Sequence, residues 1–175
     1  RVVIAAVVAV GMFATLARAQ EAAVTRLDES PRHHEWVSIV RGDRTLHAFV
    51  AYPESPVQTA AVVVIHENRG LTDWVRSFAD QLAEAGYLAI APDLLSGDGP
   101  EGGKTSDFPS SDAAREGIYG LDPERVTGDL NAAAKEQLER RRKAAKQAGK
   151  AGMAETTLEE MDASDDEEGD DEGED

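Results

Sequence analysis

Residues 62–71 read VVVIHENRGL, and this stretch decides how the rest of the chain is interpreted. The run from Ala60 to Ile65 is continuously apolar and rich in β-branched side chains, which is typical of a strand buried on both faces of a parallel sheet. The residues after it are polar and include Gly70, as expected of a turn. We therefore predict a buried strand over residues 60–65 that ends in a polar turn.

Residues 73–85 are predicted to form a helix that packs on this strand. Thr72 is a suitable N-cap residue, and Gly86 is a suitable residue just beyond the C-terminal end. Apolar side chains recur at helical intervals, which gives one stripe able to lie on a sheet. The stripe consists of Trp74, Phe78 and Leu82, with Val75, Ala79 and Ala85 beside them.

A second buried strand is predicted over residues 87–91, where Pro92 stops it. The order strand, helix, strand implies that the two strands are parallel and joined by a right-handed crossover. Before this unit, residues 35–40 and 45–50 are two β-type runs around a short turn at residues 41–44, which predicts a hairpin. The turn contains the tripeptide RGD, which matches an integrin-binding motif. Gly and Asp are, however, common in turns for local conformational reasons, which is the simpler interpretation.

The chain after residue 91 is predicted to contain no further buried strand. Residues 95–109 are rich in Gly, Ser, Pro and Asp and are expected to form an irregular loop, and a short helix is predicted over residues 112–118. Asp122 and Pro123 are a strong helix start signal. We expect the helix that follows to face the core through Val126, Leu130, Ala134 and Leu138.

The N-terminal residues 1–19 resemble a secretory signal peptide. Residues 2–16 are almost entirely apolar and Ala17-Arg18-Ala19 gives a small-x-small cleavage pattern. We therefore expect an exported protein, periplasmic or secreted, with residues 20–31 as a flexible linker and no membrane span after cleavage. The alternative is a retained anchor, although this stretch is shorter than the roughly 20 apolar residues that a spanning helix needs.

The C-terminal residues 139–175 separate into a basic segment and an acidic segment. The formal net charge of the chain is −16, and residues 155–175 carry 13 acidic and no basic side chains, so the remainder has a net charge of only −3. We expect residues 139–175 to be a basic helix or linker followed by a disordered acidic tail. The basic run has no interleaved aromatic residues and a strongly acidic neighbour, which favours neutralisation by the acidic tail over binding to nucleic acid or an anionic membrane.

Four segments together resemble dienelactone hydrolases (carboxymethylenebutenolidases). They are RHHEWV at 32–37, HENRGL at 66–71, LAEAGY at 82–87 and APDLL at 91–95. The similarity runs from about Pro31 to about Leu138 and covers the N-terminal half of that family's domain. It implies a partial α/β-hydrolase fold over residues 32–138, composed of an N-terminal hairpin, a parallel β-α-β unit and a further helix.

The resemblance also implies an activity and two site residues. The family hydrolyses lactones or related esters of small molecules with a Cys-His-Asp triad, and needs no cofactor or metal. Glu67 matches the accessory carboxylate that contacts the nucleophile, and the backbone N–H of Asn68 matches one donor of the oxyanion hole. A donor at this position faces the carbonyl oxygen as it gains negative charge.

The sequence departs from the family at the nucleophile. It contains no cysteine and no Gly-x-Ser-x-Gly elbow, and all four histidines precede any position that a nucleophile could occupy. The histidines are His33, His34, His47 and His66. We therefore interpret the chain as truncated before the elbow and inactive as given. The alternative is a non-catalytic, exported interaction module with a charged C-terminal tail.

Three other hypotheses about catalytic or metal-binding residues have less support from the sequence. Ser96 follows a predicted strand, but no helix start follows it, as a nucleophile elbow would require. His66 is more simply a hydrogen-bonding residue at a strand end than a catalytic base. His33, His34 and Glu35 could be drawn as a metal site, but adjacent residues of an extended segment point to opposite faces.

Overall fold

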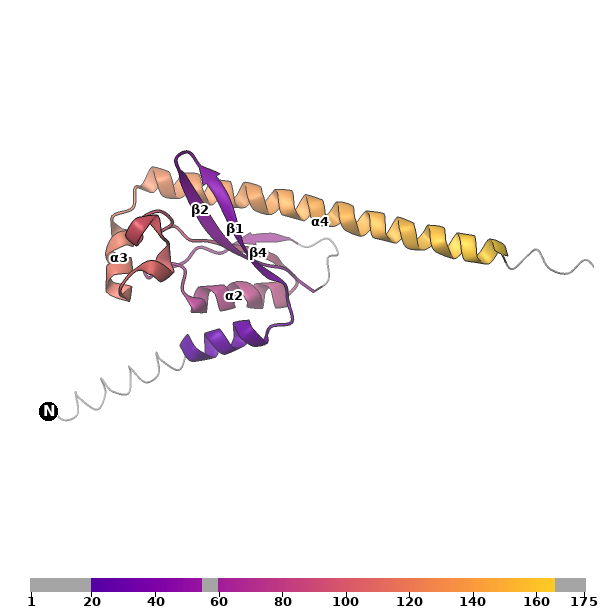
Figure 1. Cartoon of the computed structure of the whole chain (residues 1–175), viewed down its shortest axis with the longest axis horizontal. Coiled ribbons are helices and arrows are strands. Elements are labelled where there is room, and N and C mark those ends of the chain that lie inside the picture. The colour runs from indigo at the N-terminus through magenta and orange to yellow at the C-terminus, as the bar shows by residue number, and fades with distance from the viewer. Residues whose placement is uncertain (1–19, 55–59, 166–175) are drawn as a thin grey trace, which may run out of the picture.

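The structure is a computed structural model that describes residues 20–54 and 60–165. Its centre is a four-stranded sheet in the order β1-β2-β4-β3 (Figure 1). β2 is antiparallel to both β1 and β4, whereas β3 is parallel to β4. The strands are β1 (His34–Arg41), β2 (Arg44–Ala51), β3 (Ala61–Val63) and β4 (Leu88–Pro92).

The predicted N-terminal hairpin is confirmed. β1 and β2 pair in register from His34 with Ala51 to Arg41 with Arg44, so the loop has only two residues. Gly42 adopts a φ of 65°, a left-handed conformation that glycine reaches without a steric penalty.

The predicted β-α-β unit is also confirmed, with α2 (Asp73–Glu84) between β3 and β4. α2 covers one face of the sheet and α4 (Pro123–Asp165) covers the other (Figure 1). The α2 face of the core contains Phe49, Ala51, Val64, Leu71, Val75, Ala79, Ala83, Ala89 and Ala91. The α4 face contains Val37, Ala48, Val50, Leu88, Ile90 and Ala133.

The expectation that the first parallel strand is buried on both faces is wrong. β3 lies at the edge of the sheet, its three residues are only partly buried, and Ile65 just beyond it is 59% exposed. The apolar composition of residues 60–65 suits a central strand, but within the described residues nothing pairs with its second edge. Edge strands of this kind present free backbone hydrogen-bonding groups.

The predicted core stripe of α2 is shifted on the helix. Val75, Ala79 and Ala83 face the sheet, whereas Trp74 is 54% and Phe78 is 40% exposed. The two aromatic rings stack on each other with centroids 5.9 Å apart. The apolar face of α2 is therefore wider than the part that the sheet covers. Its exposed part, which contains Trp74 and Phe78, lies beside the free edge of β3, and these two residues line one groove together with Val62.

Residues 20–29 are helical, so the prediction of a flexible linker over residues 20–31 is wrong for most of this segment. Ala23 is buried, and Leu27, one helical turn later, packs against the α2 face of the core. Arg26 forms ion pairs with Asp80 and Glu84 of α2. The spacing of Ala23 and Leu27 was a helical signal within a segment that otherwise looks polar.

The predicted short helix is confirmed as α3 (Ser111–Tyr119), and the loop before it contains the 3₁₀ turns η1 (Pro100–Gly102) and η2 (Thr105–Asp107). α4 begins at Pro123, as predicted, and the side chain of Asp122 accepts a hydrogen bond from the Glu124 N–H at 3.0 Å.

The core-facing row of α4 differs from the prediction by one position. Asp129, Ala133 and Gln137 are buried, whereas Leu138 is 47% exposed. The two polar side chains make specific contacts, because Asp129 pairs with arginines and the Gln137 amide donates to the Leu88 carbonyl. Two polar residues therefore occupy positions that a hydrophobicity pattern assigns to solvent.

α4 continues without a break to Asp165. It therefore extends past residue 138, the predicted end of the domain, and into residues 155–165 of the acidic segment, for which disorder was expected. The basic run and residues 155–165 follow one another along a single helix, so these two segments do not fold back to neutralise each other. None of the helices in residues 20–54 and 60–165 combines the length and the apolar character needed to cross a membrane. The predicted signal peptide, residues 1–19, lies outside the described residues, as does the end of the acidic tail.

Candidate functional site

Glu67 and Asn68 lie in the turn that follows β3, at the end of the sheet where the parallel strands β3 and β4 both finish. Ligands of open α/β sheets bind at the carboxyl ends of parallel strands. Both residues are exposed and share one groove of about 660 Å³. The groove is lined by Gln20, Glu67, Asn68, Arg69, Gly70, Thr72, Trp74, Val75 and Ser111.

His66 is buried directly behind this turn and bridges the ends of β3 and β4. Its Nε2 accepts a hydrogen bond from the backbone N–H of Leu94 at 3.1 Å, so Nε2 carries no proton. Nδ1 therefore carries the proton and donates to the Glu67 carbonyl at 2.9 Å. Burial lowers the pKa of His66, against smaller opposing effects of the Glu67 carbonyl and the Asp93 charge. Both ring nitrogens are engaged, which is unsuitable for a general base.

A second set of bonds fixes the far end of the turn through Thr105. The buried Asp93 carboxylate accepts from the Thr105 N–H at 3.0 Å and from its hydroxyl at 2.7 Å. The same hydroxyl accepts from the Leu71 N–H at 3.0 Å. Gly70 has a φ of 76°, and a Cβ there would lie 2.2 Å from the Thr105 hydroxyl, so only glycine fits.

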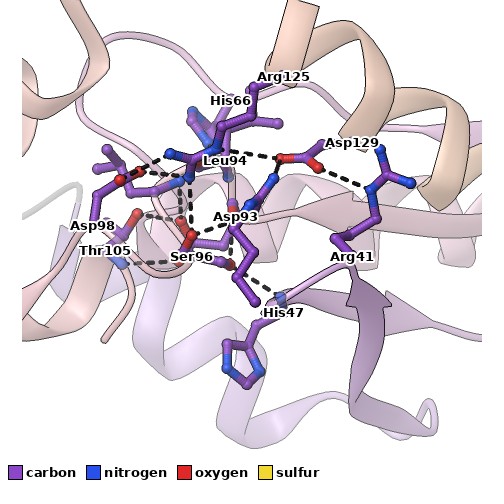
Figure 2. Close-up of polar contacts among 12 residues, drawn as sticks. Arg41, His47, His66, Asp93, Leu94, Ser96, Asp98, Thr105, Arg125 and Asp129 are labelled. Atoms are coloured by element: carbon purple, nitrogen blue, oxygen red, sulfur yellow. Dashed lines mark hydrogen bonds and ion pairs between the residues drawn. The ribbon is translucent and has the colours of Figure 1, made fainter. Parts of the chain in front are cut away.

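Ser96 is completely buried in the loop after β4 and is not available as a nucleophile. Its hydroxyl donates to the Asp93 carbonyl at 2.5 Å and accepts from the His47 N–H at 3.0 Å (Figure 2). Both hydrogen-bonding functions of the hydroxyl are used internally, so its role is to hold the loop against β2.

Arginines hold the same loop from outside. Arg125 of α4 donates to the Ser96 carbonyl at 2.9 Å and pairs with Asp98 at 2.5 Å. The buried Asp129, one helical turn later, pairs with Arg41 at 3.2 Å and with Arg44, on either side of the hairpin turn (Figure 2). α4 therefore joins the hairpin to the loop that supports the site.

The hydroxyl groups that line the groove belong to Thr72 and Ser111, and neither bonds to a histidine in residues 20–54 and 60–165. A serine–histidine contact does occur between Ser38 and His47, at 3.4 Å, but neither residue lines the groove. The two are cross-strand partners in the hairpin, and this register accounts for their contact. Around the groove, the described chain offers a carboxylate and backbone donors but no activated nucleophile.

The side chains of His34 and Glu35 turn to different partners. His34 Nε2 donates to Asp80 at 2.8 Å, whereas Glu35 accepts from Tyr52 at 2.5 Å and pairs with Arg140. Within the described part of the chain, no group of three or more His, Asp or Glu side chains is placed to hold a metal ion.

Sequence reasoning placed Glu67 and Asn68 in one turn but missed the residues that support it. Asp93 immediately follows β4, a position at the carboxyl end of a parallel strand that signals a site residue. Thr105 lies in a loop without regular pattern, so nothing in the sequence pointed to it.

Comparison with known proteins gives a consistent result. The model of the dienelactone hydrolase family matches residues 46–154, well beyond Leu138, where the sequence resemblance was predicted to end. A protein of Escherichia coli (strain K12) named as a hydrolase fragment, YghX, is 56% identical over 39 residues. A protein of Saccharolobus solfataricus named as a carboxymethylenebutenolidase is 47% identical over 49 residues. These alignments cover 22% and 28% of this chain.

A crystal structure named as a dienelactone hydrolase, from Klebsiella pneumoniae subsp. pneumoniae MGH 78578, superposes with a TM-score of 0.52 at 22% identity. The superposition covers 62% of this chain and supports the fold alone. The matches extend over 33% of the E. coli protein, 18% of the S. solfataricus protein and 44% of the K. pneumoniae chain. The chain thus spans less than half the length of each relative.

Proposed function

Because this chain belongs to the dienelactone hydrolase family, we propose that it serves the hydrolysis of an ester or lactone bond in a small molecule. It contributes the side of the site that binds the developing oxyanion. The observation that supports this proposal most strongly is the position of Glu67 and Asn68 in one exposed turn, at the carboxyl end of β3 and on the wall of the groove.

In this proposal the Asn68 N–H donates to the substrate carbonyl oxygen as negative charge develops on it. A donor fixed before the reaction needs no reorganisation, and loss of one such donor typically slows catalysis by about 10²–10³-fold. Glu67 is the accessory carboxylate that faces the nucleophile and influences its ionisation. Its side chain is exposed in the groove, where an attacking group could reach it.

The chain as given does not complete the reaction. It has no cysteine, Ser96 is buried, and no hydroxyl that lines the groove is paired with a histidine in the described residues. Attack on the carbonyl requires a nucleophile activated by a base, and the two have to lie within hydrogen-bond reach of each other. We therefore expect oxyanion binding without turnover.

An esterase assay tests this expectation directly. The purified 175-residue chain is incubated with p-nitrophenyl acetate and with dihydrocoumarin, a simple lactone, and the rates are compared with buffer. We expect no release above background. Turnover that is abolished by Ser111→Ala but not by Ser106→Ala, an exposed serine outside the groove, would contradict the assignment.

A second candidate function is a non-catalytic interaction module, favoured by the exposed Trp74–Phe78 stack. Size-exclusion chromatography with light scattering, followed by thermal unfolding, separates the possibilities. A monomer with one cooperative transition supports a self-sufficient module. Aggregation or a non-cooperative melt counts against it, because an unprotected strand edge promotes association.

Export is a separate proposal that depends on residues 1–19. Their apolar run and Ala17-Arg18-Ala19 pattern support a cleavable signal. Fusion of residues 1–31 to alkaline phosphatase, which folds only outside the bacterial cytoplasm, provides the test. An inactive fusion, or an active one that keeps residues 1–19, would contradict a cleaved signal.

A further inference from the structure

We propose that His66 is a positioning residue whose imidazole sets the orientation of the Glu67–Asn68 peptide and so directs the Asn68 N–H into the groove. The inference rests on the proposed function, because it concerns the donor assigned there. It gives His66 a role that is neither that of a base nor that of a simple strand cap.

The orientation follows from the planarity of the peptide bond. The Glu67 carbonyl and the Asn68 N–H belong to one trans peptide unit, so they point in opposite directions. The carbonyl is held toward the protein by His66 Nδ1 at 2.9 Å and by the Gly70 N–H at 3.3 Å. The Asn68 N–H is therefore directed outward, and it makes no hydrogen bond to any described residue.

Of the two hydrogen bonds to the Glu67 carbonyl, the one from His66 fixes its position relative to the rest of the fold. The Gly70 bond is longer and lies within the turn itself, so it moves with the turn. His66 instead connects the turn to Leu94, just beyond β4, whose own carbonyl accepts from Arg125 of α4 at 3.3 Å. The imidazole thus fixes the orientation of the Glu67–Asn68 peptide relative to β4 and α4.

The ring has a single arrangement that satisfies both contacts. A backbone N–H only donates and a carbonyl only accepts, so the neutral tautomer with its proton on Nδ1 is required. Because His66 is only 7% exposed, water cannot easily replace either partner. Donors held in this way retain their direction before a substrate binds, which is the condition for electrostatic preorganisation.

Two substitutions separate the two bonds. In His66→Asn, the side-chain Nδ2 occupies the position of Nδ1 and can still donate to the Glu67 carbonyl, but the Leu94 N–H loses its acceptor. In His66→Gln, Oε1 reaches the position of Nε2 and can accept from Leu94, but the donor to Glu67 is lost. Each variant therefore removes one buried hydrogen bond, which makes them matched controls for stability.

The measurement is ¹H–¹⁵N NMR of the full chain, with the residual dipolar coupling of the Asn68 N–H as the readout of its direction. Sodium acetate is the probe, because its carboxylate oxygens stand in for an oxyanion. We expect wild type and His66→Asn to share the Asn68 coupling and to show an acetate-dependent shift of that amide. In His66→Gln, we expect a changed coupling and about tenfold weaker acetate binding, equivalent to one lost hydrogen bond.

Two results would overturn the inference. One is an Asn68 coupling in His66→Gln that equals that of wild type. The other is equal loss of the wild-type coupling in both variants, which would make His66 a general structural residue. Neither readout needs turnover, so a failure of the proposed hydrolytic function would leave this result interpretable on its own.

Discussion

The carboxylate of Asp93 holds Thr105 by two hydrogen bonds, at 3.0 Å from its N–H and 2.7 Å from its hydroxyl. Through the same hydroxyl, which also accepts from the Leu71 N–H, the end of β4 is joined to the turn after β3. A loop residue 12 positions away from Asp93 in sequence thus supports the turn that carries Glu67 and Asn68.

Replacing this hydroxyl is expected to destabilise the protein. Thr105→Val keeps the shape of the side chain but leaves the Leu71 N–H without its acceptor and removes one donor from buried Asp93. We expect a loss of about 2 kcal/mol in the free energy of unfolding, measured by urea denaturation. Thr105→Ser, which retains the hydroxyl, is the control and should lose clearly less. Equal stability of the two variants would show that these bonds contribute nothing.

Gly70 is predicted to tolerate no side chain, for two independent reasons. Its φ of 76° strains any other residue, and a Cβ would collide with the Thr105 hydroxyl. Gly42 provides the matched control, because its φ of 65° is similar but its Cβ would meet nothing within 4 Å. Gly42→Ala should cost only the conformational strain, about 1 kcal/mol. Gly70→Ala should cost at least twice as much in the same unfolding assay, and equal costs would argue against the collision.

The surplus apolar face of α2 yields a prediction that contradicts the hydrophobicity pattern of the sequence. Trp74 is 54% exposed, whereas its neighbour Val75 is 5% exposed. Trp74→Gln should therefore change the free energy of unfolding by less than about 1 kcal/mol and should reduce aggregation, since it removes an exposed aromatic ring. Val75→Gln buries a polar amide in the core and should cost about 3 kcal/mol or more. A larger loss for Trp74→Gln than for Val75→Gln would mean that Trp74, and not Val75, faces the sheet.

The sequence was sufficient for the order and type of the main elements but not for which faces they bury. The strands around residues 60–65 and 87–91, and the helix start at Pro123, carry strong local signals that the fold obeys. The faces depend on what covers them. Trp74 and Phe78 have the periodicity of core residues, yet among the residues that the structure describes the sheet ends at β3 and leaves them exposed.

The same limit applied to the site. The position of Glu67 and Asn68 in one turn could be predicted because they lie within one contiguous motif, whereas their roles in the site stay a prediction. The supporting contacts of His66 with Leu94 and of Thr105 with Asp93 join segments that are distant in sequence, and they depend on backbone atoms, which have the same chemistry at every position. Polar residues such as Asp129 and Gln137 were overlooked in α4 because burial of a polar side chain is decided by its partner, not by its own hydrophobicity.

The buried Asp80 of α2 is predicted to make stability dependent on pH in the acid range. Burial alone would raise its pKa, but hydrogen bonds from Arg32, Ser30 and His34 outweigh burial and lower the pKa from 3.8 to about 2. Arg32 makes two of these bonds, both at 2.8 Å, from a side chain that is only 6% exposed.

The direction of the effect follows from the lowered pKa. The unfolded chain binds a proton at Asp80 near pH 3.8, before the folded chain does, so the stabilisation is complete above this pH and is lost as the pH falls toward 2. A difference of this size corresponds to about 2 kcal/mol. Urea unfolding of wild type between pH 5 and pH 2 should show this loss, superimposed on the titration of other carboxylates.

Asp80→Asn isolates the contribution of this carboxylate. It should lose about 3 kcal/mol at pH 7, because it leaves the buried Arg32 guanidinium without its nearest counter-charge, the next being the exposed Glu54 at 3.9 Å. Its stability should also fall less steeply than that of wild type between pH 4 and pH 2, since the titrating group is gone. Glu84→Gln is the control, because Glu84 is 55% exposed and its ion pair with Arg26 should contribute less than about 1 kcal/mol. If Asp80→Asn and wild type decline in parallel below pH 4, the lowered pKa of Asp80 is not the cause of the acid sensitivity.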